Sequence, residues 1–571
     1  MPREGVVTVG SVLHEMEEAV KTDDGTSDFQ GPPSTIISAS SHPKWLPVTS
    51  FRASIRGSTP VAPTVPYSTF CAKKQVRTAV VGSKVQFSTA LVALAATAVH
   101  AVPSLEIRGN DFVNPETGNK FHIVGMAYQP GGTSEYNPEE NGRDVLSDVE
   151  TCKRDAALMQ IMGINAIRVY NLSPDLNHDE CASVFNAAGM YMMIDVNSPL
   201  VGESLTSFEP WTSYYAAYLN RTFAIVEAFS NYPNTLLYFS GNEVINDLPS
   251  AEFAPRYIRA VTRDIKNYIR NNIDRQIPVG YSAADVREVL WDTWNYMQCS
   301  IEGEDNDESR AELFALNSYS WCGPEADFES STFEELVEGL ESTSVPVFFS
   351  EYGCNRPQPR YWNEVQSIYG NDMTGVFSGG VVYEWTEEAN NYGVVEIEGD
   401  VLTVMGDYNR LRAQFAEIDW ENVHSVSGSR EAPRAPVCRP NLIEENGFDN
   451  NFTLPVVPPG AQQLINNGIR NAPSGRLVDI DDWTVTLEVR DSDGNRMTGL
   501  EVVPLPNDEF NWAGKNVAET GTADSDSGDD EEEDPAETES PDNGDDNEGA
   551  ATMTKPVILA AALPLLALIF A

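Results

Sequence analysis

The sequence predicts an α/β protein whose central part is a (β/α)₈ TIM barrel, and three observations lead to this. Eight short runs rich in β-branched and aromatic residues recur between positions 121 and 385. The runs are almost continuously apolar, which is typical of parallel strands covered by helices on the outside. Amphipathic helical patterns separate most of them, and strands that alternate with helices in this way indicate a barrel.

The predicted strands occupy 121–129, 164–171, 189–197, 235–243, 277–283, 314–321, 345–353 and 379–385. Helical patterns with apolar residues on one face cover 148–163, 213–232 and 253–272. A doubly wound open sheet is the alternative fold. That fold usually carries a Gly-x-Gly-x-x-Gly loop after its first strand, and "AYQPGGTS" lacks this spacing. The barrel is therefore the preferred prediction.

Two of the predicted strands end on a glutamate, although both look buried. "TLLYFSGNEV" delivers Glu243 at the tip of the fourth strand, and "VPVFFSEYG" delivers Glu351 at the tip of the seventh. In this fold the carboxyl ends of the strands form the active site. Strands four and seven lie across the mouth from one another, so the two carboxyl groups are expected to face each other over a cleft.

Such a carboxyl pair can cleave a glycosidic bond, with one group as acid and the other as nucleophile. We expect Glu243 to be the acid/base and Glu351 the nucleophile, with Tyr319 donating a hydrogen bond that keeps Glu351 ionised. Asn242 is expected to bind the sugar hydroxyl beside the reacting carbon. A lone strand-end glutamate is more often a helix cap or surface residue, so the prediction depends on the pair.

Other residues at the strand tips have more than one interpretation. Glu384, Glu387 and Glu388 near the eighth strand are interpreted mainly as solvated loop residues. Several aromatic side chains at strand tips suit stacking on sugar rings, but each could also pack at the rim: Tyr128, Tyr170, Tyr281, Tyr319, Tyr383, Trp321 and Trp385. No metal-binding motif is visible, and no cofactor is predicted.

Charge and length limit the classes of function. The chain has 571 residues and a net charge of -49, which argues against nucleic acid as a partner because phosphate binding needs a basic surface. Glu519 to Glu548 contains fifteen acidic residues and no Lys or Arg. This run, within 516–548, is expected to be a disordered, solvated stalk.

The N-terminal part contains a secretory signal in an unusual place. Lys84 precedes the apolar run Phe87 to Ala101, which ends on small residues, so 84–101 is predicted to be a signal peptide cleaved after Ala101. Residues 1–83 are then either an artefact of the gene prediction or a genuine extension before a signal anchor. Cleavage would remove Cys71 and leave an even number of six cysteines.

The C-terminal end resembles a glycosylphosphatidylinositol (GPI) attachment signal. Small residues between Asn543 and Gly549 precede a polar spacer and an apolar tail, so 549–571 is expected to be removed on attachment of the lipid. A tail-anchored protein is the alternative, but it conflicts with the secretory signal. Glycosylation is predicted at Asn220 and Asn451, whereas the sequon at Asn171 is doubtful because it lies at a strand end.

The motifs "GMAYQPGG", "RVYNL", "GNEVIND", "IPVGYSA" and "FFSEYGCN" together resemble the fungal β-1,3-glucanosyltransferases of glycoside hydrolase family 72. The resemblance runs from about Ser104 to Cys438. It implies a GPI-anchored enzyme that acts on cell-wall glucan, with Glu243 as acid/base and Glu351 as nucleophile. It also implies that the sugar sites are lined by Gln129, Tyr170, Asp195, Asn242, Tyr319 and Tyr383. Tyr281, at a strand tip, is expected to bind substrate with them.

The same resemblance implies the bridges Cys152–Cys181, Cys299–Cys438 and Cys322–Cys354, whereas the residues alone leave fifteen pairings of six cysteines open. It further indicates the subgroup that lacks a cysteine-rich carbohydrate-binding module, because no cysteine follows Cys438. The expected organisation is thus a catalytic domain over 102–438 and a small β-rich or irregular appendix over 439–515, with a hairpin near 481–503.

The predicted function is extracellular remodelling of β-1,3-glucan by a GPI-anchored, monomeric enzyme at the outer face of the plasma membrane or in the cell wall. Donor and acceptor glucan chains are the expected partners. A hydrolytic endo-β-glucanase on the same fold and a non-catalytic wall-binding protein remain as alternatives. The carboxyl groups alone do not separate transfer from hydrolysis, because both proceed through the same covalent intermediate.

Overall fold

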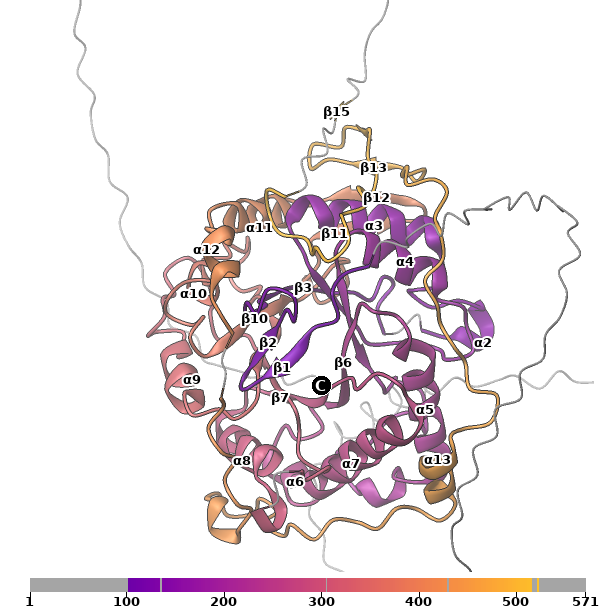
Figure 1. Ribbon diagram of the computed structural model, residues 1–571. Coiled ribbons are helices and arrows are strands. Elements are labelled where there is room, and N and C mark those ends of the chain that lie inside the picture. The colour runs from indigo at the N-terminus through magenta and orange to yellow at the C-terminus, as the bar shows by residue number, and fades with distance from the viewer. Residues whose placement is uncertain (1–100, 134–135, 304–305, 429–430, 516–520, 523–571) are drawn as a thin grey trace, which may run out of the picture. The chain divides into compact units, whose positions relative to one another are not determined.

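The computed structural model describes residues 101–133, 136–303, 306–428, 431–515 and 521–522 (Figure 1). Apart from Ala101 and residues 521–522, the predicted N-terminal extension, signal peptide, stalk and GPI signal lie outside the described residues. Within the described ranges, none of the helices combines the length and the apolar character needed to span a membrane.

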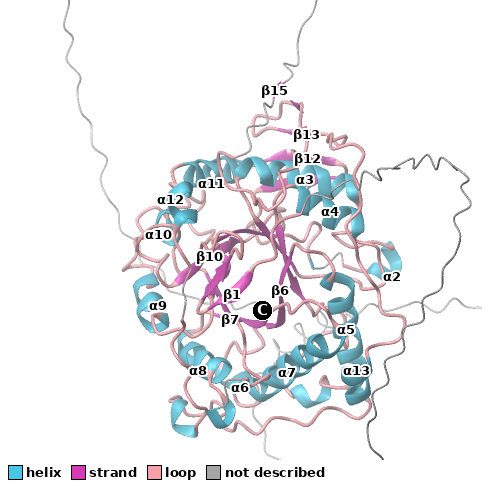
Figure 2. Ribbon diagram, in the orientation of Figure 1, coloured by secondary structure: helices cyan, strands magenta, loops and turns pink. Residues whose placement is uncertain are grey.

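A closed, parallel, eight-stranded barrel forms the centre of the molecule, which confirms the predicted fold (Figures 1 and 2). The strands follow one another in chain order around the barrel, and β10 closes it against β3. They are β3 (Ile123–Ala127), β4 (Ala166–Val169), β5 (Tyr191–Asp195), β6 (Thr235–Asn242), β7 (Val279–Ala284), β8 (Phe314–Ser318), β9 (Val347–Tyr352) and β10 (Phe377–Val382). Closure rules out the doubly wound open sheet.

Helices surround the barrel on its outer side (Figure 2). The longer ones are α3 (Val149–Met162), α4 (Asp179–Ala187), α5 (Ala216–Ser230), α7 (Ala254–Asn272), α8 (Arg287–Gln298), α9 (Phe333–Leu340) and α11 (Gly406–Ala416). Their ends follow local chemistry. Helix α3, for example, begins where the Asp148 side chain accepts the N–H groups of Glu150 and Thr151, and it ends at Gly163, whose φ is 96°.

Short elements complete the structure. The helical ones are α2 (Pro138–Asn141), η2 (Pro210–Thr212), α6 (Leu248–Ala251), η3 (Ile301–Gly303), α10 (Glu364–Ile368), α12 (Trp420–Ser425), η4 (Pro440–Leu442) and α13 (Ala461–Asn467). The extended ones are β1 (Glu106–Arg108), β2 (Asp111–Val113), β11 (Val395–Glu398), β12 (Val401–Val404), β13 (Val489–Arg490), β14 (Met497–Thr498) and β15 (Gly521–Thr522).

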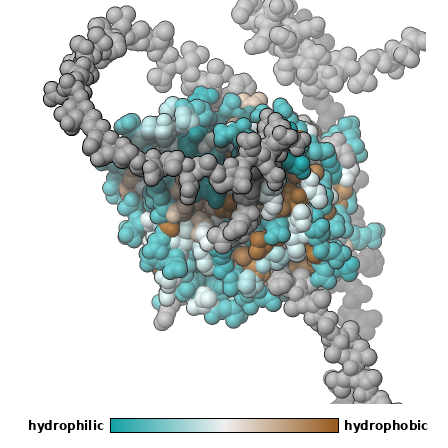
Figure 3. Space-filling view, turned by 90° about the horizontal axis from the view of Figure 1, so that it is seen from above, coloured by the Kyte–Doolittle hydropathy of each residue, from teal (hydrophilic) through white to brown (hydrophobic). Residues whose placement is uncertain are grey.

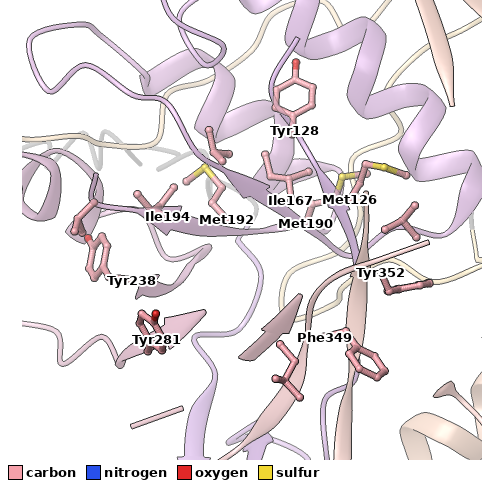
Figure 4. Packing of buried hydrophobic residues seen from close by; sticks show 14 of the residues in the cluster. Met126, Tyr128, Ile167, Met190, Met192, Ile194, Tyr238, Tyr281, Phe349 and Tyr352 are labelled. Carbon is pink, nitrogen blue, oxygen red and sulfur yellow. The ribbon is translucent and has the colours of Figure 1, made fainter. Parts of the chain in front are cut away.

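The strands bury both of their faces, which explains their nearly continuous apolar sequence. On β5, Met192 and Ile194 belong to the layer between the barrel and its helices, whereas Tyr191 and Met193 belong to the cluster inside the barrel. Figure 4 shows part of the outer layer, where Met126, Ile167 and Met192 come from neighbouring strands. Alternating burial on two sides is expected when a parallel sheet closes on itself.

Three disulfides join Cys152 to Cys181, Cys299 to Cys438 and Cys322 to Cys354, as the resemblance implied. The first links α3 to α4. The second ties the C-terminal end of α8 to the chain that leaves the barrel region, and the third links the segments that follow β8 and β9. Each bridge therefore holds a connection between neighbouring parts of the barrel.

Residues 439–515 run around the outside of the barrel instead of forming a separate unit (Figure 1). Helix α13 packs against α7, and the side chain of Asn272 donates to the carbonyl of Ile465. The predicted hairpin is present: Thr484 pairs with Glu501 and Arg490 with Arg496 in antiparallel bridges. Near the C-terminal end of this segment, the fully buried Asn511 side chain donates to the carbonyls of Gln160 and Ile164, at the end of α3 and just before β4.

The surface seen in Figure 3 is mainly hydrophilic, with hydrophobic residues in small separate patches. Of the predicted glycosylation sites, Asn220 and Asn451 are exposed, whereas Asn171 is buried. The two exposed asparagines are thus accessible to a modifying enzyme, and their glycosylation stays a prediction.

Candidate active site

Glu243 and Glu351 both lie at the carboxyl ends of barrel strands. Glu351 is the next-to-last residue of β9, and Glu243 directly follows β6. Glu243 has a φ of 46°, a left-handed conformation that a non-glycine residue rarely adopts. Its N–H donates to the carbonyl of Ser282 on β7 at 2.9 Å, which holds this conformation in place. The backbone therefore leaves the extended conformation of β6 at Glu243.

Arg168 on β4 is the cation that connects the two strand ends. It is fully buried, and its Nε and Nη2 form a two-pronged ion pair with Asp195 at 2.9 and 3.2 Å. Its Nη1 donates to Glu351 Oε1 at 3.1 Å, and its Nη2 donates to Asn242 Oδ1 at 2.9 Å. Because the guanidinium group is planar and rigid, it holds the side chains of Asp195, Asn242 and Glu351 in one fixed arrangement.

Three donors hold the Glu351 carboxylate. Besides Arg168, Tyr170 Oη donates to Oε1 at 3.0 Å and Tyr319 Oη donates to Oε2 at 2.7 Å. Burial raises the pKa of Glu351 to about 7, and the negative charge of Glu243 adds to this, whereas Arg168 and the two tyrosines lower the pKa. The expected hydrogen bond from Tyr319 is therefore present, and it favours the ionised form.

Glu243 is half-buried and is held by an amide. Asn317 on β8 donates from Nδ2 to Glu243 Oε1 at 2.9 Å. Asn242 accepts at Oδ1 from Arg168, from Ser282 Oγ at 2.7 Å and from Asn317 at 3.1 Å. Because its oxygen is occupied, the exposed Asn242 side chain has its amide N–H groups available as donors to a ligand.

The side chains after β3 and β10 form a second hydrogen-bonded group beside the carboxyl pair. Gln129 donates from Nε2 to Glu384 Oε2 at 3.0 Å and to Tyr383 Oη at 3.3 Å. Asn390 donates to Glu384 Oε1 at 2.9 Å. Glu384 is buried, and burial raises its pKa to about 7. The interpretation of Glu384 as a solvated loop residue is therefore wrong, because its carboxyl group lies between two amides.

The tyrosines on this side pack together. The ring of Tyr319 contacts those of Tyr383 and Tyr392 edge-on, with centroids 6.1 and 5.4 Å apart. Tyr383 and Tyr392 are also in edge-on contact, at 5.4 Å. All three residues are half-buried. This aromatic cluster borders the Glu351 side of the site.

Two expected sugar contacts have other partners. Tyr281 on β7 is fully buried in the outer hydrophobic layer, and its hydroxyl accepts the N–H of Ile245 at 3.0 Å (Figure 4). The expectation that Tyr281 touches sugar therefore needs correction: it supports the turn after Glu243. Asp195 is also buried and pairs with Arg168, so it acts on the site through that residue.

Sequence reasoning missed Arg168 and Asn317, which hold the site together. Each is a polar residue inside an otherwise apolar run, "INAIRVYN" and "FALNSYSW". A buried polar residue needs partners, so its presence inside a strand is a signal that could have pointed to both. In the described part of the chain, no group of three or more His, Cys, Asp or Glu side chains is arranged to hold a metal ion.

This geometry can support proton transfer and nucleophilic attack at one carbon atom. Glu351 is oriented by three donors, while Glu243 on the facing strand end is held through one oxygen only. A family model for glucanosyltransferases, glycoside hydrolase family 72, matches residues 94–419. The chain belongs to this glucanosyltransferase family. It is accordingly a transglycosidase.

Relatives and solved structures agree with this assignment. The chain is 46% identical over 431 residues to 1,3-beta-glucanosyltransferase gel2 of Aspergillus fumigatus, covering 75% of this chain and 89% of the relative. It is 42% identical to the probable 1,3-beta-glucanosyltransferase GAS3 of Saccharomyces cerevisiae, covering 68% and 78%. A Saccharomyces cerevisiae Gas2p mutant, solved with laminaritetraose and laminaripentaose, aligns with TM-score 0.55 and 33% identity, covering 62% and 75%.

Proposed function

We propose that this glucanosyltransferase cleaves β-1,3-glucan and transfers the new reducing end to a second glucan chain with retained configuration. The observation that carries the proposal is the Glu351 carboxylate, oriented by Arg168, Tyr170 and Tyr319 opposite Glu243. The laminari-oligosaccharides bound to the Gas2p mutant support β-1,3-glucan as the substrate class. Family membership supports transfer over hydrolysis.

In the first step, a carboxylate oxygen of Glu351 attacks the anomeric carbon of the donor chain. The bond from that carbon to the glycosidic oxygen breaks, and Glu243 gives its proton to the leaving oxygen. The product is a glycosyl ester on Glu351. The leaving chain takes away the proton, and Glu243 is left as a carboxylate.

In the second step, Glu243 accepts the proton of an acceptor hydroxyl as that oxygen attacks the anomeric carbon. The ester bond breaks, Glu351 recovers its negative charge, and a longer glucan is formed. Water would give hydrolysis by the same route, so transfer requires a sugar acceptor that is held close and oriented. The half-buried Tyr383 and Tyr392 are suited to hold it.

Other side chains have proposed roles in binding sugar. Gln129, Tyr170, Asn242, Tyr319 and Tyr383 each have a polar atom or a ring face at this end of the barrel, and we assign them to the sugar sites. Asp195 acts indirectly through Arg168, and Tyr281 is assigned to the turn after Glu243.

We further propose that the enzyme is a monomer at the outer face of the plasma membrane, held by a GPI lipid and in contact with the cell wall. The predicted signal peptide at 84–101 and the C-terminal pattern at 549–571 support this location. Three disulfides are compatible with the oxidising secretory pathway.

Incubation with a reduced β-1,3-gluco-oligosaccharide, followed by analysis of product lengths, tests the proposed reaction. Transfer predicts products longer than the substrate, formed together with a shorter fragment. A protein that gives only shorter products is a hydrolytic endo-β-glucanase, and one that binds the sugar without changing it is a wall-binding protein. Either result would overturn the proposal.

A further inference from the structure

An exposed aromatic patch lies on the connection between β5 and α5. Phe208 is 56% exposed, Trp211 47% and Tyr215 38%. The other described tryptophans are buried or half-buried, so the exposure of Trp211 is unusual in this chain. We call Phe208, Trp211 and Tyr215 the aromatic rim. Exposed aromatic groups that lie close together in a loop often mark a binding surface.

The backbone of the aromatic rim is held in one conformation. Trp211 lies in the short helix η2, where Thr212 N–H donates to the Glu209 carbonyl at 2.8 Å and Tyr214 N–H donates to the Pro210 carbonyl at 3.0 Å. The Trp211 ring meets the Phe253 ring edge-on, with centroids 5.5 Å apart. A ligand would thus meet a Trp211 ring that is already held in place, which lowers the entropy cost of binding.

The position of the aromatic rim connects it with the candidate active site. Its loop starts directly after Asp195, the partner of Arg168, and Asn197 donates to the Ser240 carbonyl on β6. Phe253 belongs to the connection after β6, the same connection that carries Glu243. In the barrel order, β5 and β6 lie opposite β9 and β10. Aromatic side chains are therefore present on both sides of the mouth.

We propose that the aromatic rim binds the part of a β-1,3-glucan chain that extends beyond the site at Glu243 and Glu351. Aromatic faces suit the C–H faces of glucose rings, and sugars are uncharged, so burying them against these rings carries no cost of removing a charge from water. A transferase that joins two chains must accommodate sugar on both sides of the reacting bond. The inference rests on the proposed function, and it adds a binding surface outside the carboxyl pair.

Substrate length provides the test. Phe208→Ala and Trp211→Ala, made singly and together, should lower kcat/KM on a long soluble β-1,3-glucan by about ten-fold, because the contact between ring and sugar is lost. The same variants should leave kcat/KM on laminaripentaose unchanged within about two-fold. Trp211→Tyr keeps a flat face and should retain most of the activity on the long glucan. Val456→Ala, at a position that is 84% exposed outside the barrel, is the control.

Three results would overturn the aromatic rim as a glucan surface. They are unchanged activity on the long glucan, an equal loss on both substrates, and an equal loss in Trp211→Tyr and Trp211→Ala. The unmodified protein separates this failure from that of the proposed function. If the unmodified protein changes neither substrate, the proposed function is wrong. If the unmodified protein and its Phe208 and Trp211 variants are all fully active, only the role of the aromatic rim is wrong.

Discussion

The carboxylate of Glu351 depends on a few neighbouring residues for its charge state and direction. Burial disfavours its ionised form, and three hydrogen bonds from Arg168, Tyr170 and Tyr319 oppose that effect. A nucleophile must be ionised to attack, so removal of a donor should alter the pH dependence of the reaction as well as its rate. Tyr319 is the most direct test because its hydrogen bond is the shortest of the three.

Tyr319→Phe should move the acid limb of the kcat/KM profile to higher pH. The hydroxyl stabilises the ionised carboxylate, so its loss raises the pKa of Glu351 further above its ordinary value, and a higher pH is needed to ionise it. A pH profile of the variant measures this shift. Tyr392→Phe, whose ring packs against Tyr319, is the matched control and should keep the position of the limb. An unchanged limb in Tyr319→Phe would contradict the assignment.

Glu384 fixes the direction of the Gln129 amide. Because Gln129 Nε2 donates to Glu384, its Oε1 is the acceptor of the amide. Thr133 Oγ1 donates to this oxygen at 3.4 Å, and its second lone pair can accept a sugar hydroxyl. In Glu384→Gln the new amide oxygen keeps accepting from Asn390, so the new NH2 group faces Gln129. Gln129 then turns over to accept it, and a donor replaces the acceptor that faced the sugar. We expect KM for oligosaccharide to rise about ten-fold, because a hydrogen bond to the sugar is lost and a donor faces the sugar hydroxyl in its place.

The exchange of the two side chains supplies the control for this prediction. Gln129→Glu combined with Glu384→Gln restores an acceptor at position 129 and a donor at position 384, so KM should recover most of the way. Glu387→Gln, on the same loop, should leave KM unchanged. If the double variant is no better than Glu384→Gln alone, the role of Glu384 in orienting Gln129 is wrong.

The strands and their connections could largely be predicted from the sequence, whereas much of the site could not. Apolar runs such as 345–353 identified the strands because burial on both faces leaves a strong pattern. The chain positions of Glu243 and Glu351 then followed from the rule that strand tips form the site. The contacts of Arg168 and Asn317 depend on side chains from distant strands. Tyr281 is buried because its side chain, like that of Val279, faces the outer layer of the barrel. Neither feature was visible in the sequence around these residues.

The disulfides should stabilise these connections unequally. The Cys299–Cys438 bridge joins residues 139 positions apart, and the Cys152–Cys181 bridge joins residues 29 positions apart. Each bridge is removed by replacing both of its cysteines by serine. In the chain-entropy description the losses are about 5 and about 3.5 kcal/mol of unfolding free energy. Denaturant unfolding of the two double variants measures the difference. A larger loss for the Cys152 and Cys181 variant would contradict this ranking.

At the scale of the whole molecule, residues 439–515 run along the outer side of the barrel and its helices (Figure 1). Residues 439–515 contact several helices, and Asn511 donates to two carbonyl groups, at the end of α3 and just before β4. The sequence predicts a small appendix here and does not indicate this course around the barrel, because the apolar residues of the segment show no long periodic pattern. Its polar contacts join residues far apart in the chain, 351 positions for Asn511 and Gln160 and 193 for Asn272 and Ile465, which local sequence does not reveal.

We predict that native cells carry the protein on their surface through a GPI lipid. Phosphatidylinositol-specific phospholipase should then release it from membranes, and the released protein should lack residues after the attachment point between Asn543 and Gly549. Mass spectrometry of the C-terminal peptide checks this. Detection of a peptide that ends at Ala571 in the surface protein would contradict the anchor.

Azide rescue of two variants tests the central claim, that Glu351 is the nucleophile and Glu243 the acid/base. With a donor whose leaving group needs no proton, Glu243→Gln should still form the ester on Glu351, and azide should release a product of retained configuration. Glu351→Ala should form no ester, and azide that enters the space left by the removed side chain should give the inverted product. The opposite assignment of retained and inverted products would reverse the two roles. Full activity in both variants on ordinary glucan would contradict the carboxyl pair itself.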